Sequence, residues 1–233
     1  MRDYEQALTL YQQVGDRGNE AATLSNIGRV YDGLGDRQQA LDYYGQALAL
    51  DQRLGDRAGE AVTLNNIGHA HSGLGDRQQA LDYFRQALSI TREVGDRGSE
   101  ATTLNNIGLV YNGLGDLEQA LDYYGQALPI RREVGDRAGE ASTLNNIGSV
   151  RFAQGDLDGA QQVLDEVLEI VRLVGDRATE AMASFNMAVL LATMRRVGEA
   201  VAVQHRAIDL AEQTGLPTLE QMRAFLAGLE QNG

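Results

Sequence analysis

The dipeptide Gly-Asp recurs every 20 residues along most of the chain. It begins at positions 15, 35, 55, 75, 95, 115, 135, 155 and 175. Glycine ends a helix in the left-handed conformation at low cost, and aspartate caps the next helix by accepting a backbone N–H. Each step therefore predicts one helix of about 16–17 residues followed by a tight turn. Because such turns join antiparallel neighbours and no segment alternates with the period of a strand, we predict an all-α chain.

Two kinds of segment alternate between the Gly-Asp pairs, so the full repeat is 40 residues long. The first kind resembles the sequence at 57–74 and is called the first-type helix below. The second kind resembles the sequence at 37–54 and is called the second-type helix. Small and apolar residues recur at fixed places in both; in one repeat they are Leu64, Ile67, Gly68 and His71, and in the preceding second-type helix they are Ala40, Tyr44 and Ala47. The small residues predict close contact between the two helices of a hairpin.

This pattern resembles the tetratricopeptide repeat, W-x2-L-G-x2-Y followed by A-x3-F and then P. Leu replaces Trp, Ile replaces Leu, Tyr usually replaces Phe, and the final Pro is absent. Repeats of this length resemble those of the Pins/LGN family, of kinesin light chains and of many bacterial signalling proteins. The resemblance implies a right-handed α-solenoid of about five and a half helical hairpins with a C-terminal capping helix.

The period divides the chain into segments. They are 1–14, the second helix of a truncated repeat; 16–54, 56–94, 96–134 and 136–174, four regular repeats; 176–214, a degenerate repeat; and 217–231, the capping helix. In the degenerate repeat Arg195 and Arg196 replace the Gly-Asp pair. The chain opens inside a second-type helix, so we expect either a fragment or a partner helix supplied by another molecule.

The first-type helices carry asparagines at a constant place, as in the stretch TLNNIG at 63–68. On a helical wheel the second asparagine lies about 150° from the core direction, and the resemblance places these helices on a concave wall. An amide can pair with both the C=O and the N–H of an extended peptide. We therefore expect a peptide-binding ladder, with the alternative that the amides bond to the neighbouring hairpin and set the repeat spacing. The ladder consists of Asn26, Asn66, Asn106, Asn146 and Asn186.

Specificity is expected from the residues around this ladder, which differ between repeats. The candidates are Arg29, His69, Leu109, Ser149, Phe185 and Val189. The wall is polar towards the N-terminus and apolar towards the C-terminus, where Phe152, Met182 and Phe185 favour an apolar anchor. The alternative is that Met182 and Phe185 belong to the core of the degenerate repeat. Arg and Glu three residues apart, such as Arg137 and Glu140, are interpreted as ion pairs on the helix surface.

Composition narrows the possible functions. A net charge of −13 argues against nucleic acid, because phosphate neutralisation dominates that affinity. The chain has no cysteine, no phosphate loop, no nucleophile motif and no paired histidines on one helix face, so we expect no metal, no cofactor and no catalysis. No apolar run reaches the length of a membrane span, and no signal peptide is evident, so a cytoplasmic protein without membrane contact is expected.

The leading hypothesis is a protein–protein interaction module that binds an extended peptide in the concave groove. By resemblance it would be the sensor or scaffold part of a larger bacterial signalling protein. The alternative is a structural module that self-assembles, for example as a homo-dimer through the exposed N-terminal half-repeat.

Overall fold

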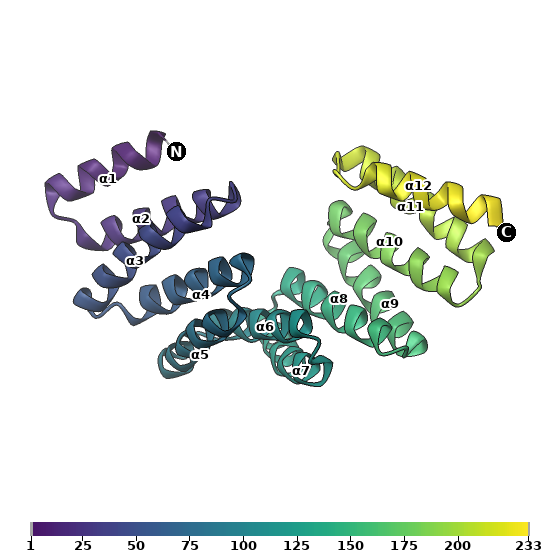
Figure 1. Cartoon of the computed structure of the whole chain (residues 1–233), viewed down its shortest axis with the longest axis horizontal. Helices are drawn as coiled ribbons and strands as arrows, with labels where there is room; N and C mark the ends of the chain where they lie inside the picture. Colours follow the sequence, from purple (N-terminus) through teal and green to yellow (C-terminus); the bar gives the residue numbers. More distant parts are fainter. Residues whose placement is uncertain (1, 233) are drawn as a thin grey trace. The chain divides into compact units, whose positions relative to one another are not determined.

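The computed structural model describes residues 2–232, and every regular element in that range is an α-helix, which confirms the predicted all-α repeat array (Figure 1). The helices are α1 (Arg2–Val14), α2 (Arg17–Gly33), α3 (Arg37–Leu54), α4 (Arg57–Leu74), α5 (Arg77–Val94), α6 (Arg97–Leu114), α7 (Leu117–Val134), α8 (Arg137–Ala153), α9 (Leu157–Val174), α10 (Arg177–Thr193), α11 (Val197–Thr214) and α12 (Leu219–Asn232). The even-numbered helices from α2 to α10 are first-type helices. The repeat boundaries given above, which follow from the 40-residue period, remain a proposal.

The Gly-Asp pairs end one helix and begin the next, as predicted. All nine glycines have positive φ, from 70° at Gly55 to 88° at Gly75. Most of the aspartates accept a hydrogen bond from the backbone N–H three residues further on, as Asp96 does from Ser99 at 3.0 Å. The degenerate repeat departs from this rule: Arg195 adopts a φ of 60°, and Arg196 makes no side-chain cap.

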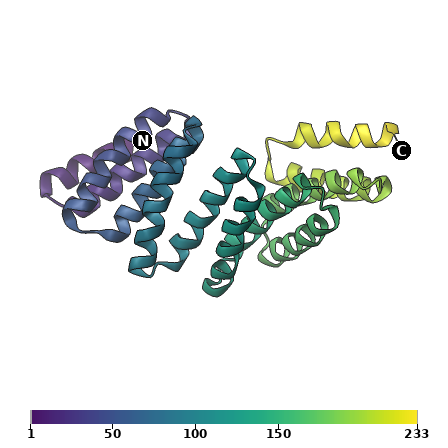
Figure 2. The same cartoon turned by 60° about the horizontal axis from the view of Figure 1, so that its bottom comes forward.

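The chain forms two compact units, residues 1–130 and residues 131–233. In unit 1, α2 packs on α3 and α4 packs on α5, and the first-type helices α2, α4 and α6 contact one another in sequence order. In unit 2, α8 packs on α9 and α10 packs on α11. The last helix, α12, lies alongside α11 (Figure 2).

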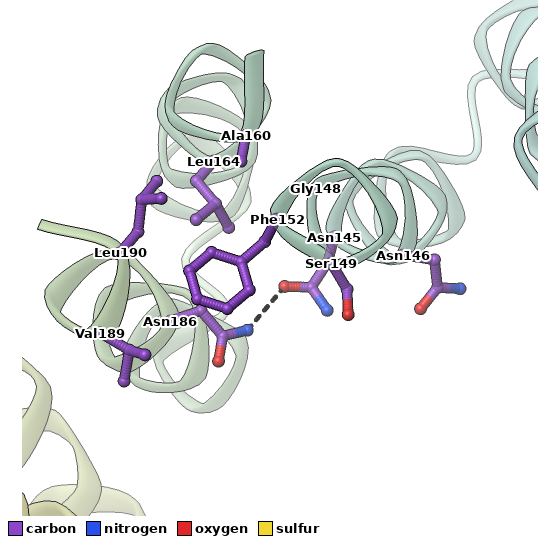
Figure 3. Close-up of a pocket in the computed structure, with 10 residues that line it drawn as sticks. All are labelled: Asn145, Asn146, Gly148, Ser149, Phe152, Ala160, Leu164, Asn186, Val189 and Leu190. Carbon is purple, nitrogen blue, oxygen red and sulfur yellow. Dashed lines mark hydrogen bonds between the residues drawn. The ribbon is translucent and has the colours of Figure 1, made fainter. Parts of the chain in front are cut away.

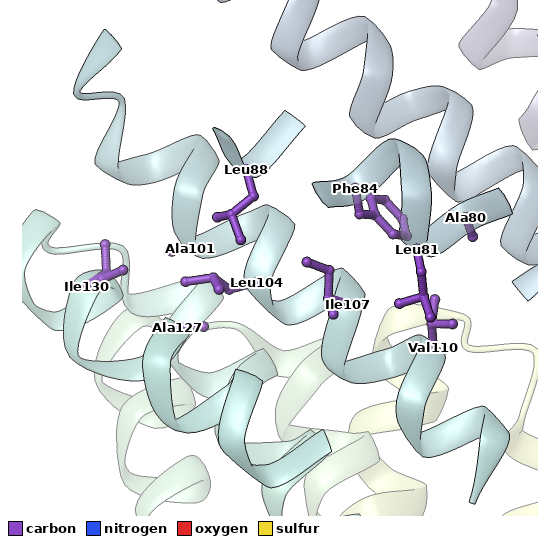
Figure 4. Packing of buried hydrophobic residues seen from close by; sticks show 10 residues of the cluster. All are labelled: Ala80, Leu81, Phe84, Leu88, Ala101, Leu104, Ile107, Val110, Ala127 and Ile130. Carbon is purple, nitrogen blue, oxygen red and sulfur yellow. The ribbon is translucent and has the colours of Figure 1, made fainter. Parts of the chain in front are cut away.

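A glycine and an aromatic ring hold each hairpin of unit 1 together. Phe84 of α5 lies directly against Gly68 of α4, where an added Cβ would stand 2.7 Å from the ring. The same contact joins Gly28 to Tyr44 and Gly108 to Tyr124. These rings are almost fully buried. Figure 4 shows the packing around Phe84. The close approach that the small residues predicted is therefore present in unit 1.

Four of the five Arg–Glu pairs are present, and the fifth arginine, Arg177, donates to Gln213 instead. The prediction that these pairs lie on the surface was wrong for the glutamates. The five glutamates of this pattern are buried: Glu20, Glu60, Glu100, Glu140 and Glu180. Each also accepts a hydrogen bond from the end of the preceding helix. Glu140, for example, accepts from Arg137 at 2.7 Å and from Arg132 at 2.7 Å. The tight turn folds the end of one helix over the start of the next, and this encloses the carboxylate.

Candidate functional site

The variable residues predicted to give specificity occupy equivalent positions on the first-type helices. Arg29, His69 and Leu109 are exposed in unit 1, and Ser149 is exposed in unit 2, where Val189 is half-buried. We call this set the first-helix face of each unit. His69 is held by Asp32, with Nδ1 and Oδ2 at 2.8 Å.

The asparagine ladder lies beside the first-helix face, and its amides are half-buried. Three of them donate hydrogen bonds to the preceding hairpin of the same unit. Asn66 donates to Ser25 Oγ at 3.3 Å, Asn106 to Asn65 Oδ1 at 3.2 Å, and Asn186 to Asn145 Oδ1 at 2.9 Å. These bonds fit the alternative that the amides space the repeats. They engage one N–H of each amide, so the side-chain oxygen and the second N–H are not used by these contacts.

A pocket of about 250 Å³ opens on the first-helix face of unit 2 (Figure 3). Helices α8 and α10 form its walls, and α9 forms its floor. The lining residues are Asn145, Asn146, Gly148, Ser149, Phe152, Ala160, Leu164, Asn186, Val189 and Leu190. The hydrogen bond between Asn186 and Asn145 spans the rim in Figure 3. Four predicted residues, Asn146, Ser149, Asn186 and Val189, therefore meet at one cavity.

This pocket exists because an aromatic ring is absent from its floor. Leu164 stands at the position that Tyr44, Phe84 and Tyr124 occupy in unit 1. A Cβ added to Gly148 would lie 3.6 Å from Val163 and 3.7 Å from Leu164, which is ordinary contact. The exposed ring of Phe152, 37% accessible, borders the space. The pocket thus combines an apolar floor with an amide-lined rim.

Phe185 is a correction to the predicted site. Its side chain is only 9% exposed and packs edge-on against Phe225 of α12, with ring centroids 5.6 Å apart. Met182 packs against the same cluster. Because α12 covers this side of α10, Phe185 belongs to the core and is not available to a ligand. Residues Gly148 and Leu164, which shape the pocket, were not among the predicted site residues, although aligning the repeats shows the loss of the ring.

A second pocket, of about 340 Å³, lies on the first-helix face of unit 1. It is lined by the predicted residues Asn26, Arg29 and Asn66 and by three aspartates, Asp51, Asp56 and Asp96. Burial raises the pKa of Asp51, and the nearby charges of Asp56 and Glu60 act in the same direction, against the hydrogen bond from Thr63. This pocket is polar and acidic, in contrast to the pocket of unit 2.

Two kinds of site are not found among residues 2–232. No group of three or more His, Cys, Asp or Glu side chains is arranged to hold a metal ion. In the same range, every helix is too short or too polar to cross a membrane.

A family model described as tetratricopeptide repeat matches the chain at residues 2–53, 34–93, 59–133 and 139–213. Among curated protein sequences, none matches the chain significantly. Solved structures do match, and the three described next are at most 21% identical to this chain.

Three of these structures illustrate the range. BtubC (BKLC) from P. vanneervenii has a TM-score of 0.75 and 21% identity, over 97% of this chain and 91% of that one. A signal transduction ATPase from Pyrococcus horikoshii with a tetratricopeptide repeat sensor has a TM-score of 0.80 and 17% identity, over 97% of this chain and 36% of that one. The Rap conjugation gene regulator of plasmid pLS20, solved with the Phr* peptide, has a TM-score of 0.74 and 16% identity. That match covers 93% of this chain and 59% of the regulator.

Proposed function

The chain belongs to the tetratricopeptide repeat family, and from that premise we propose that it is a protein-interaction module. It binds an extended segment of a partner protein along the first-helix face. The backbone of that segment lies against the asparagine amides, and a bulky apolar side chain enters the pocket between α8 and α10. In the full-length protein this module acts as a sensor or scaffold of a signalling pathway.

The unit 2 pocket is the observation that carries this proposal. Its interior is apolar at Ala160, Leu164 and Leu190, whereas its rim holds the amides of Asn145 and Asn186. Ligand pockets are typically apolar with a few polar groups that fix orientation. The side-chain oxygen of Asn186, which its bond to Asn145 does not use, can accept the N–H of a bound peptide. The archaeal sensor protein and the peptide-bound Rap regulator support the proposal by analogy of fold.

The experiment is a selection from a displayed library of random peptides on the full chain, followed by affinity measurements on two variants. Leu164→Phe restores the ring found in unit 1 and fills the pocket floor. Leu114→Phe makes the same change at an exposed position of α6, outside both pockets. We expect selected peptides to share a bulky apolar residue and to lose about tenfold or more in affinity for Leu164→Phe, but not for Leu114→Phe. A selection without binders, or equal binding by both variants, refutes the proposal.

Self-assembly is a second candidate because α1 exposes apolar side chains. None of its residues is buried. Leu10 is 57% exposed, whereas Leu50, at the equivalent position of α3, is 7% exposed. Tyr4 is likewise exposed where Tyr44 is buried. Leu8 on the other side of α1 packs against the core of α2 and α3. Exposed apolar stripes of this kind are common at interfaces between subunits.

Sedimentation of the full chain tests this candidate. If α1 forms a symmetric contact between two copies, Leu10→Glu converts a dimer into a monomer. Thr9→Glu adds the same charge at a neighbouring exposed position and serves as the control. A monomeric wild type, or a dimer that survives Leu10→Glu, excludes α1 as the interface.

A further inference from the structure

The start of each first-type helix is capped by an aspartate, and the five copies of this cap can be compared within one chain. They are Asp16, Asp56, Asp96, Asp136 and Asp176. In each copy Oδ1 accepts the backbone N–H of the residue three positions further on. The second carboxylate oxygen, Oδ2, needs a donor of its own, and the copies differ in which group supplies it.

Three copies use the side chain of that same residue. Asn19 donates to Asp16 Oδ2 at 2.7 Å, Ser99 to Asp96 Oδ2 at 2.7 Å, and Thr179 to Asp176 Oδ2 at 2.6 Å. The donor is therefore built into the first turn of the helix. The remaining two copies have a glycine there, Gly59 and Gly139, and cannot use this solution.

In the Gly139 copy a guanidinium takes over. Arg131, near the end of α7, is buried and pairs with Asp136 Oδ2. A Cβ on residue 139 would collide with the Arg131 guanidinium, so the glycine leaves the room that this group needs. A similar arrangement follows at the start of α9, where Arg151 of α8 contacts Asp156 beside Gly159. Glycine next to the cap thus accompanies a bound guanidinium twice in unit 2.

In the Gly59 copy the equivalent of Arg131 is Asp51, a residue of opposite charge. Asp51 is 4% exposed, and its Oδ2 accepts from Thr63 at 2.9 Å. A Cβ on residue 59 would lie 3.0 Å from Asp51 Oδ1 and 2.8 Å from Asp56 Oδ2, so both oxygens converge on the same space. Within residues 2–232 neither of these two oxygens accepts a hydrogen bond. Both carboxylates line the unit 1 pocket.

The neighbouring cations of the described chain do not neutralise this pair. Arg57 binds Glu60 at 2.5 Å and Glu93 at 2.6 Å. Arg53 is bonded to the carbonyl of Ala49. Arg29 lines the same pocket but forms no ion pair with another residue of the described range. A buried carboxylate without a cation is costly, because its charge is removed from water without compensation.

We propose that the space beside Gly59 is a subsite for an arginine side chain of a partner protein. The guanidinium occupies the place that Arg131 takes in the Gly139 copy and donates to Asp51 Oδ1 and Asp56 Oδ2. Its planar fork of N–H groups suits two acceptors better than an ammonium does. The inference deepens the proposed function and rests on it, since the arginine is carried by the partner protein that the module binds.

A titration of the full ¹⁵N-labelled chain with the probe acetyl-Gly-Arg-Gly-amide tests the subsite by NMR. The matched probes carry lysine or citrulline, which is isosteric with arginine but uncharged. We expect saturable shifts at the amides of Gly59 and Thr63, with a dissociation constant of ~1 mM, and binding of the citrulline probe weaker by about tenfold or more. The affinity of the lysine probe is expected to lie between those of the arginine and citrulline probes. Equal binding of the arginine and citrulline probes, or no saturable binding, overturns the proposal.

Variants of Asp51 provide the second arm. Asp51→Arg copies Arg131, fills the subsite from within and abolishes binding of the arginine probe. Asp51→Asn weakens binding by about tenfold, whereas Asp42→Asn, the same change at an exposed site of α3 outside the pocket, leaves binding unchanged. If Asp51→Arg does not fold, binding of the arginine probe to Asp51→Asn alone tests the subsite. Unchanged binding by Asp51→Asn overturns the subsite.

The two proposals fail separately. The arginine probe reports on unit 1 alone, and the Leu164→Phe variant leaves that unit unchanged. If selected peptides bind the unit 2 pocket but the arginine probe does not bind, only the subsite is lost. If no peptide binds the chain at all, the proposed function is lost, and with it the partner that would carry the arginine.

Discussion

The hairpin α4–α5 in unit 1 and the hairpin α8–α9 in unit 2 share one pattern but differ at the aromatic position of the second helix. In the first, Phe84 fills the space over Gly68; in the second, Leu164 leaves the space over Gly148 open. The first hairpin is closed and the second carries a pocket. The glycine is retained in both, so its presence alone does not reveal whether the hairpin is tightly packed.

The two pockets show the same principle with different chemistry. In unit 2 an aromatic ring is absent from the packing, and the cavity that results is apolar. In unit 1 a guanidinium is absent from a cap, and two carboxylate oxygens remain without a donor. In both places, another copy of the repeat shows which group fits the space. Departures from the repeat therefore identify candidate sites and suggest what chemistry each would bind.

Removal of the ring from unit 1 has the largest expected effect on stability. Phe84→Ala leaves a cavity in a fully packed core and lowers the free energy of unfolding by about 3–5 kcal/mol. Leu164→Phe inserts a ring where a pocket already exists, so its cost is expected to stay below about 1 kcal/mol. Urea denaturation followed by circular dichroism measures both. A large loss for Leu164→Phe contradicts the account of the pocket.

The next largest difference in stability is expected between substitutions of two equivalent glycines, Gly108 in unit 1 and Gly148 in unit 2. Gly108→Ala places a Cβ 2.5 Å from the buried Tyr124 ring, and we expect a loss of about 1–3 kcal/mol. Gly148→Ala meets only ordinary contacts and gains up to about 1 kcal/mol, because alanine favours the helix. The same denaturation experiment compares the two. Equal effects at both positions show that the close approach is not specific to unit 1.

Acid weakens the contacts between consecutive helices through the buried glutamates. Burial alone raises the pKa of Glu140, but hydrogen bonds from Arg132 and Arg137 outweigh it and hold the pKa below its usual value. The pKa of Glu100 is lowered by Arg92 and Arg97 in the same way. A carboxylate with a lowered folded-state pKa stabilises the fold fully above its unfolded-state pKa, about 4.3. This contribution is lost as the pH falls through the folded-state value.

We therefore expect the free energy of unfolding to fall as the pH drops below about 4.3. Glu140→Gln removes one of these carboxylates, costs about 1–3 kcal/mol at neutral pH and flattens the acid dependence. Glu133→Gln, at an exposed position of α7, is the control and should have less effect on either property. The measurement is urea denaturation at a series of pH values. An acid dependence unchanged by Glu140→Gln rejects the assignment.

The smallest effect concerns the degenerate turn between α10 and α11. Arg195 holds a φ of 60°, which glycine adopts at lower cost. Arg195→Gly is expected to raise the free energy of unfolding by up to about 1 kcal/mol. Gly175→Ala, at the regular turn before α10, is expected to lower it by about 1 kcal/mol. Thermal melts measure this pair, and changes of the same sign at both positions contradict the conformational explanation.

The helices, their caps and the close contact at the small residues could be predicted because each depends on residues close in sequence or repeated at a constant period. The burial of Glu140 could not, because its second partner, Arg132, lies across a turn and is not within the same helix. The helical wheel could not show whether Phe185 lies in the groove or in the core, because α10 is apolar on most of its surface. Only the packing of α12 against α10 determines which side is buried. The pocket required knowing that no other side chain replaces the ring at Leu164.

The central claim is that the first-helix face of unit 2 binds an apolar side chain through its pocket. A double-mutant cycle tests it most directly, with Leu164→Phe in the protein and alanine for the shared apolar residue in a selected peptide. If that residue enters the pocket, each change alone weakens binding about tenfold and the two together weaken it little further. If the losses multiply, the peptide residue binds elsewhere and the claim is wrong.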